Sequence, residues 1–309
     1  MPSDLPFTGE RFVPGAANAK GEMWYEHWHR YHYVLPLVTG KRVVDVACGE
    51  GYGSALMSGV AAEVTGVDIS AEAIAHARNA YAAVGNLKFI EGSCLKLPFD
   101  TGSIDVAVSF ETIEHIHEQS EFLDELKRVL KPDGVLILSS PNKAEYTDKR
   151  GYANEFHVKE LYRAELEALL ALRFPHSRWL SQRNAFVSLI AEDGEHPAGE
   201  SLAVSQSAPD KKVEALPALY YLIFASGDAS ALEALPRRIS AFTDAEEWAY
   251  NDYRETYRGF RHYMQREKEL EAECARLRAE LDTRGSAGMV PAAANSDSWL
   301  ARLIKRLAN

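Results

Sequence analysis

An acid and three closely spaced glycines form the densest group of chemically informative residues in this sequence. Asp45 lies in an apolar, β-branched run that is typical of a buried parallel strand, which we expect over about Arg42–Ala47. Gly49, Gly51 and Gly53 follow, and a helix is expected to begin between the last two. Glycine at such a turn lets the backbone approach a ligand without a Cβ in the way, and the unpaired N–H groups of the helix start face that ligand. The sequence therefore predicts a ligand-binding turn.

A second acid, Asp68, ends the next strand-like run, Glu63–Val67. Nucleotide-binding α/β folds place an acid about 20 residues beyond the glycine turn, where it holds ribose hydroxyls. One carboxylate accepts hydrogen bonds from two vicinal hydroxyls, so the chemistry suits this role. The alternative is an N-cap for the expected helix Ala71–Ala82, but Ser70 is the better cap. We therefore predict that Asp68 binds ribose.

Two histidines are candidates for acid–base chemistry. His115 follows a fourth strand-like run, Ser103–Phe110, and His157 follows a fifth strand and its loop. Glu111 or Glu114 would orient His115 and raise its basicity. The alternatives are a capping or core role for His115 and a helix N-terminal position for His157. Glu111, Glu114 and His115 are also residue types that ligate divalent ions, but such neighbours are common without one, so no metal is assigned.

The order of these motifs resembles that of class I S-adenosylmethionine (SAM) dependent methyltransferases. The spacing Asp45-x-x-x-Gly49-x-Gly51 resembles that family's first motif and differs from the G-x-G-x-x-G fingerprint of dinucleotide sites. The Pro-Asp-Gly turn at 132–134 is also typical of the family. The resemblance covers about residues 40–225. It implies an α/β fold with a Rossmann-like, seven-stranded, mostly parallel sheet and helices on both faces, and SAM as the cofactor.

The resemblance also implies which residues contact the cofactor. Asp45 and the glycine turn would receive the methionine part of SAM, and the loop at Ser93 would bind the adenine edge. The family often has Asp at the position of Ser93, so the atom that reads the adenine stays open. Cys94 fits a small apolar wall better than a nucleophile. The predicted cofactor contacts are Asp45, Gly49, Gly51, Tyr52, Asp68, Ile69, Ser93, Cys94 and Phe110.

Methyl transfer to an alcohol needs a base that removes the hydroxyl proton. Open α/β sheets bind ligands at the carboxyl ends of their strands. The loop after the fourth strand should therefore face the transferred methyl group. We predict His115 as the base, with His157 as the second candidate and Glu111 as a further catalytic residue.

The N-terminal segment suggests the class of acceptor. Its phrases Phe7–Pro14 and Glu26–Tyr31 resemble the start of bacterial methyltransferases encoded with glycosyltransferases for surface (O-antigen-type) polysaccharides. An aromatic and Arg/His-rich cap would close over cofactor and acceptor and offer stacking surfaces for a sugar. We expect Trp28 to pack and His29 or Arg30 to contact ligand.

The resulting prediction is an O-methyltransferase that acts on a sugar or glycan hydroxyl in surface-polysaccharide assembly. The alternatives are a methyltransferase for a natural-product or quinone-like small molecule, and a SAM-binding scaffold for glycosyltransferases. A glycosyltransferase is a candidate partner. The net charge of −11 argues against nucleic acid as a partner, because a general nucleic-acid binder needs a basic face.

The chain is expected to have four regions. They are an N-terminal cap (1–40), a methyltransferase domain (41–226) with an insertion around 184–212, a helical coiled-coil extension (227–284), and a linker with a short amphipathic helix (285–309).

The C-terminal extension carries an a/d rhythm. Leu270, Cys274, Leu277 and Leu281 are spaced by 4, 3 and 4 residues, while Glu267 interrupts the seam. The pattern predicts a homo-oligomer, a dimer or trimer. The alternative is an amphipathic helix that lies on the α/β domain.

Composition and targeting signals favour the cytoplasm. The 309 residues include three scattered cysteines, which fit a reducing compartment and lack the spacing of a zinc site. Neither a signal peptide nor a membrane span is expected. The segment Ser298–Leu307 has an apolar side and a basic side. This pattern suits weak contact with the inner membrane surface, docking to a partner or fraying, and only three basic residues support the membrane alternative.

Overall fold

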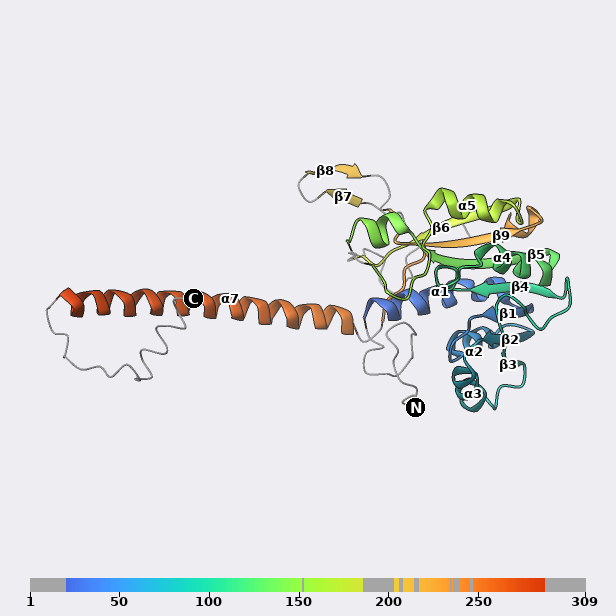
Figure 1. Ribbon diagram of the computed structural model, residues 1–309, viewed down its shortest axis with the longest axis horizontal. Coiled ribbons are helices and arrows are strands. Elements are labelled where there is room, and N and C mark those ends of the chain that lie inside the picture. Colours follow the sequence, from blue (N-terminus) through green and yellow to red (C-terminus); the bar gives the residue numbers. More distant parts are fainter. Residues whose placement is uncertain are drawn as a thin grey trace, which may run out of the picture. The chain divides into compact units, whose positions relative to one another are not determined.

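The computed structural model describes residues 21–151, 153–185, 203–205, 208–213, 217–233, 235, 239–244 and 247–286. Figure 1 shows these residues in colour. The chain divides into two compact units, Met1–Thr243 and Asp244–Asn309. All the residues to which the sequence assigns cofactor or catalytic roles belong to the first unit.

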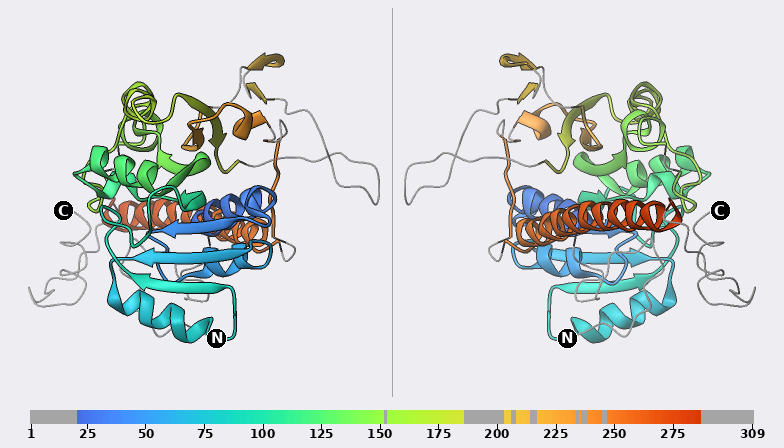
Figure 2. Two further views of the ribbon diagram at one scale, coloured as in Figure 1. Left: turned by 90° about the vertical axis from the view of Figure 1, so that its right-hand side faces the viewer. Right: turned by 90° about the vertical axis from the view of Figure 1, so that its left-hand side faces the viewer.

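A seven-stranded sheet forms the centre of the first unit (Figure 1), in the order β3-β2-β1-β4-β5-β9-β6. The strands are β1 (Arg42–Val46), β2 (Glu63–Asp68), β3 (Leu87–Glu91), β4 (Ile104–Ser109), β5 (Leu130–Pro141), β6 (His176–Gln182) and β9 (Tyr220–Ser226). The first five strands of this order pair in parallel, and both views of Figure 2 show β1, β2 and β3 side by side in blue to cyan. The predicted seven-stranded, mostly parallel α/β sheet is confirmed.

The two strands at this end of the sheet run in opposite directions. β9 pairs antiparallel with β5 on one side and with β6 on the other, so β9 alone is reversed and β6 forms the edge. The burial of the two strands explains this order. All residues of β9 are buried, as a central strand requires, whereas β6 is half-buried to exposed.

Helices cover both faces of the sheet because successive strand residues point to opposite sides. Val43 packs with side chains of α1 (Glu22–Val38), α2 (Tyr52–Ser58) and α3 (Ala71–Ala80). Val44 packs on the other face with side chains of α4 (Gln119–Val129) and α5 (Arg163–Ala171). The predicted helix start at Tyr52 and the Ser70 cap are both present, since Ser70 Oγ accepts the Ala73 N–H at 3.2 Å.

The described residues between 227 and 243, a range that the sequence places in the helical extension, include side chains that pack on the sheet unit. Leu232 of α6 (Ser230–Glu233) and Leu235 are buried in the same core cluster as α1. The ring of Phe242 stacks on His29 at 5.3 Å. The division between the units therefore lies after Thr243.

The remaining elements are a hairpin and a long helix. β7 (Ala203–Ser205) and β8 (Ala208–Val213) pair antiparallel within the predicted insertion. α7 (Trp248–Ser286) forms the described part of the second unit, and residues 250–283 are exposed. The phrase 7–14 and the segment 298–307 lie outside the described residues.

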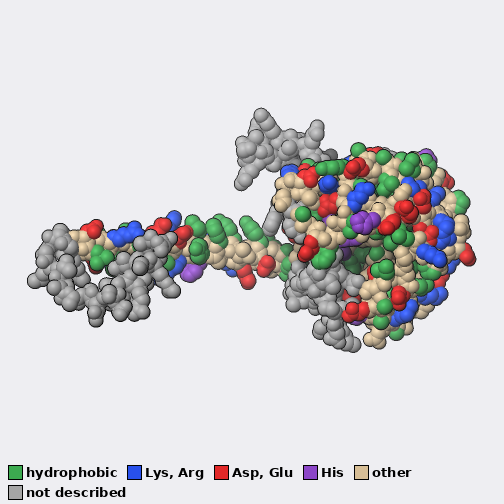
Figure 3. Space-filling view, in the orientation of Figure 1, with side chains coloured by type: hydrophobic (Ala, Val, Ile, Leu, Met, Phe, Trp, Pro, Cys, Tyr) green, Lys and Arg blue, Asp and Glu red, His purple; other side chains and the backbone are tan. Residues whose placement is uncertain are grey.

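Two surface properties concern possible partners. On the face of the sheet unit drawn in Figure 3, acidic and basic side chains are interspersed, without a continuous basic patch among the described residues. Among the described helices, none combines the length and the apolar character needed to cross a bilayer.

Candidate active site

The glycine turn after β1 has a backbone that other residues rarely adopt. Gly49 and Gly51 have φ values of 57° and 87°, in the left-handed region that favours glycine. A Cβ on Gly51 would also lie 2.4 Å from the Phe89 ring. Gly53 has a different role, because a Cβ there would lie 2.0 Å from the buried ring of Tyr31. The third glycine therefore allows α1 to pack closely on α2.

Asp45 connects β1 to these two helices. Its Oδ2 accepts the Ser54 hydroxyl at 2.6 Å, and the Tyr31 hydroxyl donates to its Oδ1 at 3.3 Å. Only 1% of Asp45 is exposed, and this burial raises the pKa of its carboxyl to about 7. Asp45 thus supports the turn from the interior of the domain, and its predicted contact with the cofactor stays a prediction.

Asp68 fastens the glycine turn to β2. Its Oδ2 accepts the Gly49 N–H and its Oδ1 accepts the Ser70 N–H, both at 2.8 Å. A carboxylate has about four acceptor positions, so each oxygen keeps capacity for a ribose hydroxyl. Ile69, directly beyond it, is 78% exposed and offers an apolar surface next to that carboxylate.

The other predicted cofactor residues lie at the ends of neighbouring strands. Ser93 Oγ accepts the Leu95 N–H at 3.2 Å and so shapes the loop after β3. Burial raises the pKa of the Cys94 thiol, which agrees with a wall residue rather than a nucleophile. Phe110 contacts the Tyr31 ring edge-on, with centroids 4.9 Å apart.

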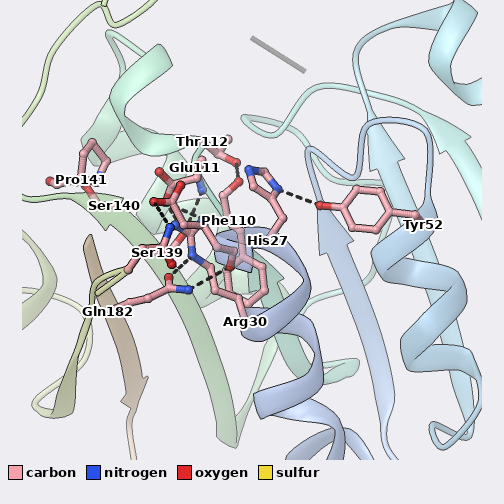
Figure 4. A network of polar contacts seen from close by, with 12 residues as sticks. His27, Arg30, Tyr52, Phe110, Glu111, Thr112, Ser139, Ser140, Pro141 and Gln182 are labelled. Atoms are coloured by element: carbon pink, nitrogen blue, oxygen red, sulfur yellow. Dashed lines mark hydrogen bonds and ion pairs between the residues drawn. The ribbon is translucent and has the colours of Figure 1, made fainter. Parts of the chain in front are cut away.

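Tyr52 belongs to a polar contact that joins α1 to α2. Its hydroxyl is hydrogen-bonded to His27 Nδ1 at 2.7 Å, as Figure 4 shows. Burial, with a further contribution from the nearby positive charge of Arg30, lowers the pKa of His27 to about 3. His27 is therefore a neutral imidazole beside the predicted cofactor residue.

A buried arginine network lies between α1, the end of β4, and β6 (Figure 4). Arg30 is 2% exposed, and its Nη1 lies 3.1 Å from Glu111 Oε1. Its Nε donates to Gln182 Oε1 at 2.6 Å, and its guanidinium lies 4.6 Å from the Tyr220 ring centroid. Arg30 Nη2 is buried without a hydrogen-bond partner among the described residues. Sequence reasoning named Arg30 as a ligand contact but missed Gln182 and Tyr220.

Glu111 forms an ion pair with this arginine. Its backbone has a φ of 48°, and its N–H donates to Ser139 Oγ at 2.9 Å. The same hydroxyl donates to Glu111 Oε1 at 2.5 Å. A second acid near Arg30, Glu26, is 5% exposed, and burial raises its pKa to about 7. Arg30 therefore lies between two carboxylates.

His115 and His157 come together, although 41 residues separate them. Their ring centroids are 4.9 Å apart. His115 Nδ1 lies 2.9 Å from the Phe156 carbonyl oxygen, and His157 Nδ1 lies 2.6 Å from Glu160 Oε1. Of the two acids that the sequence pairs with His115, Glu114 lies beside both histidines.

Comparison with known proteins agrees with the architecture. Residues 44–138 match a family model described as a methyltransferase domain. A probable S-adenosylmethionine-dependent methyltransferase of Mycolicibacterium smegmatis is 39% identical over 55% of this chain, and the match spans 65% of that relative. The phthiotriol/phenolphthiotriol dimycocerosates methyltransferase 1 of Mycobacterium ulcerans is 32% identical over 74% of this chain and 73% of its own length.

Two more distant likenesses add to this. A ubiquinone biosynthesis O-methyltransferase of Glaesserella parasuis is 32% identical over 34% of this chain and 47% of its own length. A solved complex of the Haloferax volcanii Trm112 methyltransferase activator with a putative methyltransferase matches 66% of this chain and 91% of its own, with a TM-score of 0.50 and 20% identity. At that identity the solved structure supports the fold alone.

A mostly parallel sheet with one reversed strand and a glycine turn after β1 defines a nucleotide-binding α/β domain. This chain belongs to the SAM-dependent methyltransferase family. SAM is the cofactor of that family, and the site residues fit it. Two glycines at positive φ form the turn, and Asp68 retains acceptor capacity beside the exposed Ile69.

Proposed function

We propose that this protein transfers the methyl group of SAM to a hydroxyl oxygen of a sugar or sugar-linked acceptor. The observation that carries the proposal is the pairing of His115 with His157. The glycine turn and His115 both follow the carboxyl ends of central strands. β1 and β4 are parallel neighbours. The turn after β1 and the 3-10 helix η1 (Ile113–His115) after β4 therefore start at the same side of the sheet, where the strands have their carboxyl ends.

The chemistry follows from the groups at that edge. The glycine turn and Asp68 hold the cofactor, which supplies an activated methyl group when bound. The imidazole cluster of His115 and His157 removes the acceptor's hydroxyl proton, and His115 leads this role. Arg30, Glu26 and Glu111 orient the acceptor by hydrogen bonds, because positioning the attacking oxygen in line with the methyl group supplies much of the rate.

A polar acceptor is supported by the buried arginine network. Arg30 Nη2 has no hydrogen-bond partner among the described residues, and the aromatic Tyr220 lies beneath the guanidinium. Oxygen-rich acceptors such as sugars satisfy such donors. The second candidate is a quinone-like or lipid hydroxyl, which the names of the relatives from Glaesserella parasuis and Mycobacterium ulcerans favour. A role in surface-polysaccharide assembly with a glycosyltransferase partner belongs to the first candidate.

The test uses the full-length protein, methyl-labelled SAM, and two acceptor panels, one of sugars and glycans and one of catechols and quinols. We expect labelled products from the sugar panel. His115→Ala should retain S-adenosylhomocysteine binding and lose transfer by about 10² to 10⁴. The control is His117→Ala, an exposed histidine two residues away, which should keep full activity. Products from the catechol panel alone would replace the sugar by the second candidate.

A further inference from the structure

Three potential metal ligands lie close together near the carboxyl end of β4. Glu114, His115 and His157 each offer one ligand atom, and these atoms lie within 4.8 Å of one another. Glu114 is 1% exposed, and the His157 side chain is 7% exposed. Two ligands come from η1 and the third from the loop that follows η2 (Ala144–Asp148), so the fold brings the set together.

Both imidazoles are oriented through Nδ1. A carbonyl oxygen only accepts, so His115 Nδ1 donates to Phe156 O and, in the neutral ring, Nε2 carries the lone pair. His157 Nδ1 is in the same way directed at Glu160 Oε1, whose partner oxygen accepts the Thr147 hydroxyl at 2.5 Å. Metal-binding histidines nearly always donate their second nitrogen to a carbonyl or carboxylate, which fixes the tautomer and the ring.

Backbone hydrogen bonds hold the two ligand-bearing segments together. The Glu114 carbonyl accepts the N–H groups of Val158 and Lys159, both at 2.9 Å. Gln119 Nε2 donates to the carbonyls of Ile113 at 2.9 Å and Lys159 at 2.8 Å. The ligand set is therefore held by ordered segments, as metal sites require.

We propose that Glu114, His115 and His157 bind one divalent transition-metal ion that holds the acceptor's oxygens. Two histidines with one glutamate are a ligand set of catalytic Zn²⁺ sites, which keep a position open for water or substrate. Imidazole favours Zn²⁺ and its neighbours, whereas Mg²⁺ prefers an all-oxygen set. Zn²⁺ bonds of about 2.0–2.1 Å place tetrahedral ligand atoms about 3.3–3.4 Å apart. Shifts of the three ligand atoms by roughly 1 Å, through side-chain rotation, would bring them to that spacing.

The ion deepens the proposed function and rests on it. An open metal position takes a hydroxyl, and two open positions take neighbouring oxygens, so the site fits a vicinal diol. The bound hydroxyl loses its proton to water, because the cation lowers its pKa. The freed oxygen lone pair forms the O–CH3 bond, and the S–CH3 bond breaks with its electron pair left on sulfur. In this arrangement the two imidazoles act as metal ligands, and the proton of the bound hydroxyl goes to water instead of to the imidazole cluster.

The test measures metal binding without SAM or acceptor. Tag-free, full-length protein is stripped with a chelator and titrated with Zn²⁺, Co²⁺ and Mg²⁺ by calorimetry, and the Co²⁺ complex is followed by its visible absorption. We expect one Zn²⁺ per chain, much weaker Mg²⁺ binding, and a Co²⁺ spectrum of a four- or five-coordinate site. If the intact protein shows no saturable Zn²⁺ binding, the proposal is overturned.

Variants locate the site. His115→Gln and His157→Gln should each weaken Zn²⁺ binding by more than about 100-fold, and Glu160→Gln by about 10- to 100-fold through the His157 ring. His117→Gln is the matched control and should bind as the original protein does. These variants avoid the deeply buried Glu114, and circular dichroism checks their fold. Zn²⁺ binding that survives both His115→Gln and His157→Gln would overturn the assignment.

The two proposals fail separately. If Zn²⁺ binds as expected but no hydroxyl acceptor is methylated, the site stands and the proposed function falls. If hydroxyl methylation proceeds at full rate in protein that binds no metal, the proposed function stands and the metal site falls.

Discussion

At the scale of single residues, Asp68 holds the Gly49 N–H and keeps lone pairs for a ligand, and we predict that this ligand is the ribose of SAM. Asp68→Ala removes these acceptors. The loss of charge-assisted hydrogen bonds should lower affinity for S-adenosylhomocysteine by about one to three decades. Calorimetry on the folded variant measures this. Glu72→Ala, an exposed acid in the first turn of α3, is the control, and equal affinity in Asp68→Ala would remove the ribose role.

Asp45 should leave a pH signature in stability. Its carboxyl pKa rises from 3.8 to about 7 on folding because of burial. Between these values the folded protein binds more protons than the unfolded chain, so its stabilising contribution is complete below about pH 4 and is lost as the pH rises through 7. Asp45→Asn should therefore reduce this fall, which for one group is at most about 1.4 kcal/mol per pH unit.

Urea unfolding at several pH values between 4 and 8 measures the effect. The exposed Asp100→Asn is the control and should keep the original pH dependence. A slope in Asp45→Asn that equals the original slope would show that this carboxyl is not the group that titrates.

At the scale of elements, Gly53 determines how closely α1 approaches α2. Ala is favoured over Gly in a helix by about 1 kcal/mol, but the added Cβ would lie 2.0 Å from the buried Tyr31 ring. Overpacking of this kind costs about 1–3 kcal/mol, so Gly53→Ala should be destabilising overall. Urea unfolding tests this against Gly85→Ala, where the Cβ meets nothing within 4 Å. A stabilised Gly53→Ala would contradict the packing.

The elements near the glycine turn could be predicted because their signals are local. The β1 run, the turn and the Ser70 cap each lie within a few residues of the chain. The reversed β9 could not be placed, since its position between β5 and β6 depends on pairing across the sheet. The burial of Arg30 had a sequence signal that was not used. Four residues of α1 recur at every fourth position and share its buried face, namely Glu26, Arg30, Val34 and Val38.

The sequence named the candidate site residues one by one but did not show which of them meet. His115 and His157 were named separately, and their meeting depends on the bonds between Glu114 O and the 158–159 backbone. The sequence left Glu111 and Glu114 open as partners of His115, and it gave no sign of the ion pair between Glu111 and Arg30, because Arg30 comes from a distant helix.

At the scale of the whole molecule, α7 should set the oligomeric state. Tyr253, Tyr257 and Phe260 continue the apolar rhythm that Leu277 and Leu281 complete, and all five are about half exposed or more in the single chain. Burying such a stripe between chains gains about 25 cal/mol per Å² of apolar area. We expect a dimer or trimer for the full chain and a monomer that still binds SAM after truncation behind Thr243. Light scattering measures how many chains each particle contains. If the full-length and the truncated protein have the same number of chains per particle, any association is made outside α7.

We propose that this protein transfers a methyl group from SAM to a hydroxyl oxygen at the carboxyl ends of the strands, near the glycine turn and the two histidines. Incubation of the full-length protein with trideuteromethyl-SAM and the sugar panel, followed by tandem mass spectrometry, tests it most directly. We expect one trideuteromethyl group per product, attached to oxygen, and no such product in the His115→Ala reaction. A label on nitrogen or carbon, or SAM that is bound but never consumed with any acceptor, would contradict it.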